Sequence, residues 1–225
     1  MLKCDSTNKK EDNLINKLEL KDINKKIGNE IILKDINLVF ESGKVYVLSG
    51  DNGSGKTMLI RLIAGLIYGD TGDILFNDIV QKKYVKRIFS QGIIIENDLM
   101  YERLSLKDNL NMLASINKKV TKREIDDLIK RVNLEDCSNK KLSQYSLGMK
   151  KRAMIAQSIL DKPDVLLWDE PCNGLDEESR QIFYDICLEE KRRGAIIIIS
   201  SHIQEDLSVL ADEVIKISKG EVLSE

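Results

Sequence analysis

The residues best suited to chemistry form one short segment, Gly50-Asp51-Asn52-Gly53-Ser54-Gly55-Lys56-Thr57, which fits the P-loop pattern G-x-x-x-x-G-K-[ST]. Its glycines let backbone N–H groups turn inward around phosphate oxygens, and a helix that starts there adds the positive end of its dipole. We expect Lys56 to reach the β- and γ-phosphates of a nucleotide and the Thr57 hydroxyl to hold Mg²⁺. The segment therefore predicts a nucleoside triphosphate site.

Two adjacent carboxylates, Asp169 and Glu170, form the second chemical feature. They follow the apolar run 165–168, which has the length of a buried strand. Ligands of α/β sheets bind at the carboxyl ends of the strands, so the pair is placed where a nucleotide would lie. Asp169 can organise Mg²⁺ and its waters, and Glu170 can act as a general base on the attacking water. Charged pairs at strand ends are common, so this interpretation depends on the P-loop.

A sheet must position these residues, because the P-loop and the carboxylates each follow a short apolar run typical of a buried parallel strand. Such runs occupy 45–48, 165–168 and 195–199, and a weaker one occupies 214–217. After the P-loop, helical spacing of apolar side chains predicts a helix that contains Leu59, Ile60, Leu62 and Ile63. Strands that alternate with helices indicate an α/β fold with a mostly parallel sheet.

The other segments complete a single domain that we predict over residues 17–225. The stretches 18–23 and 31–40 have strand character and flank a turn-prone segment, so we expect an antiparallel pair of lead-in strands. Residues 104–160 show helical spacing, which predicts a helical subdomain at about 91–160 inserted between core segments at about 17–90 and 161–225. Residues 1–16 are polar and predict a flexible extension.

Composition argues against several classes of function. The 225 residues include 35 basic and 37 acidic side chains, and a formal net charge of -2 removes the electrostatic argument for a nucleic-acid partner. The longest wholly aliphatic run, 195–199, is far shorter than the ~20 apolar residues that cross a bilayer. The polar N-terminus holds no secretory signal, so we expect a cytoplasmic location. The cysteines lack metal-ligand spacing, so no zinc site is predicted.

A third motif lies between the P-loop and the carboxylates and reads Tyr145-Ser146-Leu147-Gly148-Met149-Lys150-Lys151-Arg152. The order of the three motifs resembles the nucleotide-binding domains of ABC transporters, and the resemblance covers residues 17–225. It implies a RecA-like P-loop NTPase core. In that family the third motif is called the signature segment, and the resemblance implies that its Ser146 and Gly148 contact the γ-phosphate of ATP held by a second subunit, at a dimer interface. Ser146 is equally suited to cap the helix that follows.

Three further residues match positions of that family. Gln91 resembles the glutamine that contacts Mg²⁺ and the attacking water, and the alternative is a surface glutamine. Asp176 resembles a residue that touches the opposite subunit, although a helix cap is an equally physical role. His202, the only histidine, resembles the residue that senses the γ-phosphate, and the alternative is a structural histidine.

Other positions depart from the family pattern. The family usually has an aromatic residue that stacks on adenine where this chain has Ile27, so the choice between ATP and GTP stays open. Leu147 and Met149 replace the commonest signature residues, a variant that resembles exporters of peptides, antibiotics and related hydrophobic cargo. Cys172 lies beside the carboxylates, where an exposed thiol would be open to oxidation and a buried one would be inert.

The resemblance implies the ATP-hydrolysing subunit of a transporter, with ATP and Mg²⁺ as ligands and export as the favoured direction. Its implied partners are a second nucleotide-binding domain, identical or a paralogue, and a separate transmembrane permease that would hold the chain at the inner face of the cell membrane. We expect the permease to dock near 92–95 and 97–106, unless the isoleucines there are core.

The main rival is a soluble ABC-type ATPase that acts on a non-transport assembly. DNA-end proteins of this kind carry a long coiled coil between the P-loop and the signature, whereas only residues 92–144 follow Gln91 here before the signature. A module that keeps ATP as a structural ligand is disfavoured by the presence of Lys56, Asp169, Glu170 and His202 together. A small-molecule kinase is disfavoured by the signature segment.

Overall fold

The computed structural model describes residues 15–95, 100–117, 120–202 and 209–223. They form two sheets and five α-helices, with the helices as follows: α1 (Lys56–Ala64), α2 (Leu106–Asn117), α3 (Lys122–Arg131), α4 (Leu147–Ile159) and α5 (Glu177–Arg193). Two short 3₁₀ turns, Glu135–Cys137 and Leu142–Gln144, lie between α3 and α4. Within the described residues, no helix is long and apolar enough to cross a membrane.

The larger sheet has six strands in the order β10-β9-β3-β8-β7-β6. Four of its five strand pairings are parallel, and only the edge strand β10 pairs antiparallel with its neighbour β9. The strands are β3 (Lys44–Ser49), β6 (Gln91–Ile94), β7 (Val165–Asp169), β8 (Ile196–Ser200), β9 (Glu213–Ser218) and β10 (Glu221–Val222). This arrangement confirms the predicted α/β core, since the apolar runs of the sequence form β3, β7, β8 and β9.

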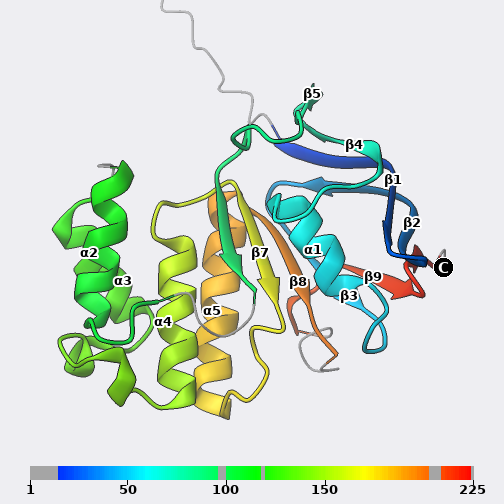
Figure 1. The fold of residues 1–225 in the computed structure, drawn as a ribbon. Coiled ribbons are helices and arrows are strands. Elements are labelled where there is room, and N and C mark those ends of the chain that lie inside the picture. The colour runs from blue at the N-terminus through cyan, green and yellow to red at the C-terminus, as the bar shows by residue number, and fades with distance from the viewer. Residues whose placement is uncertain (1–14, 96–99, 118–119, 203–208, 224–225) are drawn as a thin grey trace, which may run out of the picture.

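The smaller sheet is antiparallel and has the order β2-β1-β4-β5, with β1 (Lys17–Ile27), β2 (Glu30–Glu41), β4 (Thr71–Phe76) and β5 (Ile79–Val80). Strands β1 and β2 form the predicted lead-in pair. In Figure 1 this sheet lies on one side of α1, and the strands of the larger sheet lie on the other side. Helix α1 carries the P-loop at its N-terminus, so the two sheets together hold the loop in place.

Both faces of the central strands are buried, which explains why their sequences are continuous apolar runs rather than alternating ones. In β7, Val165 and Leu167 face the cluster around α1, whereas Leu166 and Trp168 face the cluster formed with the helices α2 to α5. Figure 1 shows α4 and α5 beside the larger sheet and α2 and α3 farther out. Helices α2 and α3 are thus connected to the sheet through α4, while α5 packs directly on it.

The structure corrects one expectation drawn from the sequence and decides between two pairs of alternatives. The predicted helical segment began at 91, but Gln91–Ile94 is strand β6 of the larger sheet, since it pairs in parallel with β7. Ile94 and Ile95 are buried, so the alternative that they belong to the core is confirmed, and residues 97–99 of the predicted docking surface lie outside the described residues. Cys172 is only 1% exposed, which agrees with the alternative of a buried, inert thiol.

Candidate active site

The P-loop connects β3 to α1 and folds around its own lysine. Gly50 has a φ of 152°, and a Cβ there would lie 2.1 Å from the carbonyl oxygen of Ile217 in β9, so only glycine fits. Lys56 is buried, and its ammonium group donates hydrogen bonds to the carbonyl oxygens of Gly50 at 2.7 Å and Asp51 at 3.1 Å. The loop therefore holds a positive charge at the point where the helix begins.

The N-terminus of α1 is suited to an anion. Its cap residue, Gly55, has a φ of 113° and offers no side chain to the N–H groups of the first turn, and that turn contains no acidic residue. Backbone N–H groups and the positive end of the helix dipole therefore face outward beside Lys56. A phosphate chain is the ligand that this combination fits.

Thr57 and Asp169 meet at the same edge of the larger sheet, although 112 positions separate them in the sequence. The Thr57 hydroxyl donates to one carboxylate oxygen of Asp169 at 2.8 Å. The other oxygen accepts a hydrogen bond of 2.5 Å from the hydroxyl of Ser200. Ser200 is fully buried at the end of β8, and the parallel register pairs it with Asp169 at the end of β7. Two neighbouring strand ends thus fix the carboxylate.

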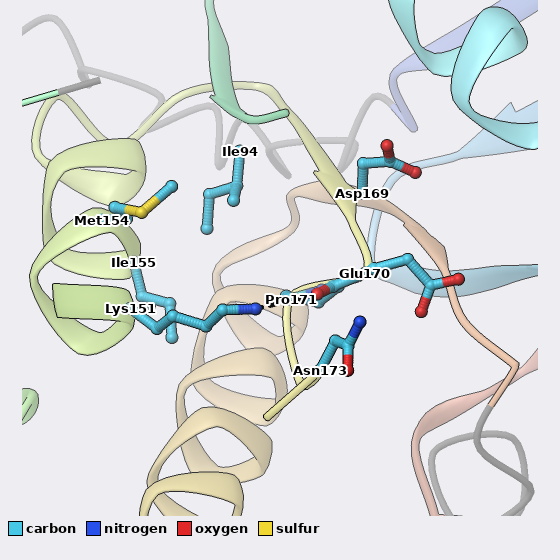
Figure 2. A pocket seen from close by; sticks show the side chains of 8 residues that line it. All are labelled: Ile94, Lys151, Met154, Ile155, Asp169, Glu170, Pro171 and Asn173. Carbon is cyan, nitrogen blue, oxygen red and sulfur yellow. Dashed lines mark hydrogen bonds between the residues drawn. The ribbon is translucent and has the colours of Figure 1, made fainter. Parts of the chain in front are cut away.

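Glu170 leaves the sheet in an unusual backbone conformation, with a φ of 48°. Its N–H donates to the backbone oxygen of Ser200 at 3.1 Å and to the side-chain oxygen of the same residue at 3.0 Å. A non-glycine residue with such a φ is held there by its surroundings, and such positions cluster at functional sites. The carboxylate of Glu170 is consequently directed away from Asp169, as Figure 2 shows.

His202 lies beside Glu170, and its Nδ1 atom is 2.9 Å from the carboxylate. The histidine side chain is 54% exposed and that of Glu170 is 25% exposed, so both can reach a ligand at the surface of the site. The sequence placed His202 after the strand now seen as β8, and the structure brings it to the carboxylates. The direct contact between His202 and Glu170 was not predicted.

Gln91 does not reach this edge of the sheet. It is the first residue of β6 and pairs with Val165, the first residue of β7, whereas Asp169 is the last residue of β7. Its side-chain amide donates to the carbonyl oxygen of Ala64 at the end of α1, at 2.9 Å. The prediction that Gln91 contacts Mg²⁺ and the attacking water is therefore wrong, because the strand begins at this residue instead of ending there.

Comparison with known proteins agrees with this geometry. The family model described as ABC transporter matches residues 33–173. The chain belongs to the ABC transporter family. It is 42% identical to the uncharacterised ABC transporter ATP-binding protein YybJ of Bacillus subtilis (strain 168), over 90% of this chain and 93% of that protein. It is 34% identical to the lantibiotic transport ATP-binding protein SrtF of Streptococcus pyogenes, over 92% of this chain and 90% of that protein.

The fold is that of solved ABC cassettes. One solved structure, a dimeric bacterial ABC transporter cassette, is 21% identical in sequence and superposes with a TM-score of 0.81. The superposition covers 92% of this chain and 97% of the chain in that structure. At that identity the likeness concerns the fold. The family assignment makes the chain an ATP-binding cassette and an ATPase.

The signature segment of this ABC cassette lies at the start of α4. The Ser146 hydroxyl oxygen accepts a hydrogen bond from the N–H of Met149 at 3.3 Å, so Ser146 caps the helix as expected. Ser146 and Leu147 are exposed, and Gly148 is half-buried. A Cβ on Gly148 would lie 3.3 Å from the hydroxyl of Ser179 in α5, so this turn packs closely on its neighbour.

Asp176 is the N-cap of α5, and its carboxylate accepts a hydrogen bond from the N–H of Ser179 at 2.8 Å. Hydrogen bonds from the hydroxyl and the N–H of Ser179 hold the pKa of Asp176 below its usual range. The capping role is thus visible within one cassette. The role at a dimer interface stays a prediction.

Two groups around the carboxylates were missed by sequence reasoning. The first is Ser200, for which the sequence offers one signal, a hydroxyl side chain at the end of an isoleucine-rich strand. The second is Lys151 of α4, whose ammonium group lies 3.5 Å from the backbone oxygen of Glu170. Lys151 lines a cavity of about 150 Å³ between α4 and β7. Figure 2 shows its side chain pointing from the helix toward Glu170 and Pro171.

Proposed function

We propose that this ABC cassette hydrolyses ATP with Mg²⁺ and drives export through a separate membrane subunit. The observation that carries the proposal is the meeting of Thr57, Asp169, Glu170 and His202 at one edge of the sheet, beside the P-loop. These residues come from three separate parts of the chain. A phosphate site, a pair of oxygen ligands for a cation and a candidate base are the parts that ATP hydrolysis requires.

The residues that would hold Mg²⁺ are Thr57 and Asp169. Mg²⁺ prefers oxygen ligands and binds through one or two carboxylates or hydroxyls together with substrate phosphates and water. Here a hydroxyl and a carboxylate already touch, and they lie next to the anion site at the start of α1. The donor set therefore fits the ion. When bound, Mg²⁺ would neutralise negative charge on the phosphates.

Glu170 is the proposed general base. The oxygen of a water molecule attacks the γ-phosphorus, the bond between that phosphorus and the bridging oxygen of ADP breaks, and the water proton passes to the carboxylate of Glu170. Lys56 stabilises the charge that develops on the phosphate oxygens. His202 contacts Glu170 and is exposed enough to contact the γ-phosphate as well, so it positions both groups.

A second cassette is the proposed partner at the nucleotide. Ser146 and Leu147 are exposed at the start of α4, where N–H groups of a first helical turn can contact a phosphate held by another chain. Ser146, Gly148 and Asp176 would then act across a dimer interface formed by identical chains or by paralogues. The dimer of the structurally similar bacterial cassette supports this arrangement.

The proposed membrane partner is a separate permease that keeps the cassette at the inner face of the cell membrane. The name of the relative SrtF, a lantibiotic transport ATP-binding protein, supports transport as the purpose of hydrolysis. Export is supported by the Leu147 and Met149 variant of the signature. Within the proposed docking surface, Glu102 forms an ion pair with Lys150 of α4, so a charge reversal at Glu102 would also disturb the signature helix.

The test is ATPase turnover of the purified chain over a range of protein concentrations, with and without Mg²⁺, beside Glu170→Gln. We expect turnover per chain to rise with concentration, to require Mg²⁺ and to fall by about 10²–10⁴-fold in the variant while ATP binding persists. Unchanged turnover in Glu170→Gln would exclude this base. Co-purification with a soluble assembly and no membrane protein would support the non-transport ATPase instead.

A further inference from the structure

The peptide that follows Glu170 is held by a charged group from the helical subdomain. Lys151 is half-buried in α4, and its ammonium group lies 3.5 Å from the backbone oxygen of Glu170. It reaches that oxygen across the cavity lined by Ile94, Met154 and Ile155 (Figure 2). The polar part of the lining comes from Asp169, Glu170 and Asn173, so the ammonium enters the cavity from its apolar side and meets the Glu170 backbone oxygen there.

The backbone of Glu170 needs support on both sides. A φ of 48° places it in a region that side-chain-bearing residues rarely adopt, so the conformation persists only where neighbouring groups enforce it. Ser200 binds its N–H through two oxygens, at 3.0 and 3.1 Å. Its carbonyl oxygen accepts a hydrogen bond from the N–H of Asn173 in the following turn, at 3.2 Å, and one from Lys151 of α4, at 3.5 Å. The two peptide groups that flank Glu170 are thus held by β8 on one side and by the following turn together with α4 on the other.

We propose that Lys151 is a positioning residue, which holds the Glu170 peptide so that the carboxylate points at the attacking water. The proposal rests on the proposed role of Glu170 and extends it to a residue outside the nucleotide site. Lys151 touches neither substrate nor the reacting atoms, so its effect passes through Glu170. Burial lowers the pKa of Lys151, in agreement with an ammonium group drawn away from bulk water.

The position of Lys151 gives this contact a further consequence. It lies one turn after Ser146 and Gly148 on the same helix. A rigid displacement of α4 therefore moves the signature segment and the support of Glu170 together. The helix that would contact the nucleotide of the partner cassette thus also orients the candidate base of its own cassette.

The experiment compares Lys151→Met with Lys151→Arg, which keeps a donor of similar length. The loss of one charge-assisted hydrogen bond predicts a fall in kcat of about tenfold in Lys151→Met, with KM for ATP changed by less than about twofold. Arginine should restore most of the rate. Lys130→Met is the matched control, since it removes an exposed lysine from α3, and its turnover should equal that of the parent.

A double variant makes the test specific. In a Glu170→Gln background, Lys151→Met should cause no further loss, because residues that act through one group are not additive. Thermal melting of all variants checks that they fold. A normal kcat in folded Lys151→Met, or a tenfold loss that persists in the Glu170→Gln background, would overturn the proposal. Unchanged turnover in Glu170→Gln alone would instead refute the role of Glu170.

Discussion

Replacement of Ser200 by alanine tests whether the two strand ends orient the carboxylates. The hydroxyl donates to Asp169 at 2.5 Å and accepts from the N–H of Glu170 at 3.0 Å, and the residue is fully buried. A hydrogen bond to a charged group contributes about 1.5–3 kcal/mol. The N–H of Glu170 keeps its hydrogen bond to the backbone oxygen of residue 200 in the variant. The loss of its bond to the hydroxyl therefore costs little. We expect Ser200→Ala to lower the free energy of unfolding by about 2 kcal/mol.

The same change should affect catalysis, because partners that orient a metal-binding carboxylate typically contribute 10–100-fold to metal affinity or activity. ATPase activity is measured as a function of Mg²⁺ concentration, and we expect either a higher half-saturating Mg²⁺ concentration or a lower kcat by about tenfold or more. Urea unfolding gives the stability.

Ser90→Ala is the matched control. The Ser90 hydroxyl also donates to a carboxylate, that of Asp164, and accepts a hydrogen bond from the backbone N–H of the same residue. Ser90, however, is exposed and lies just before β6, far along the chain from the carboxylates of the site. Its loss should cost less than about 1 kcal/mol and leave the Mg²⁺ dependence unchanged. Normal Mg²⁺ dependence and normal kcat in Ser200→Ala would refute the reasoning. So would equal losses of stability in the two variants.

Two further predictions concern stability. Glu190 is buried between Arg131, at 2.9 Å, and Arg193, at 2.6 Å, so Glu190→Ala should lower the free energy of unfolding by about 3 kcal/mol in urea titrations. The neighbour Glu189 is exposed, and Glu189→Ala should cost less than about 1 kcal/mol; similar losses would contradict the argument. Hydrogen bonds from Lys162 and Thr121 lower the pKa of Glu124 to about 2 from 4.5, so its contribution is complete above pH 4.5 and is lost as pH falls toward 2. The difference in melting temperature between the parent and Glu124→Gln should therefore shrink over that interval, and a difference that grows on acidification would disprove the assignment.

The failure of the Gln91 prediction shows where sequence reasoning ends. Residues 89–95 form an apolar stretch interrupted by Ser90, Gln91 and Gly92, and no local feature says which part pairs with β7. The register decides, because it places Gln91 opposite Val165 and Ile94 opposite Trp168. A displacement of a few residues along a strand moves a side chain from one edge of the sheet to the other.

The sequence by itself determined the features that depend on adjacent residues. The P-loop is one, since its glycines and N–H groups are contiguous, and the helix caps Ser146 and Asp176 are others. The apolar runs also determined the parallel core, because strands buried on both faces must be apolar throughout.

Only the tertiary structure decided which distant side chains meet. The contact of Thr57 with Asp169, that of His202 with Glu170 and that of Lys151 with the Glu170 peptide depend on strand register and on how α4 packs against the sheet. Register and packing follow from the simultaneous burial of apolar side chains from many segments. No single stretch of sequence contains that information, so these contacts become visible only in the folded chain.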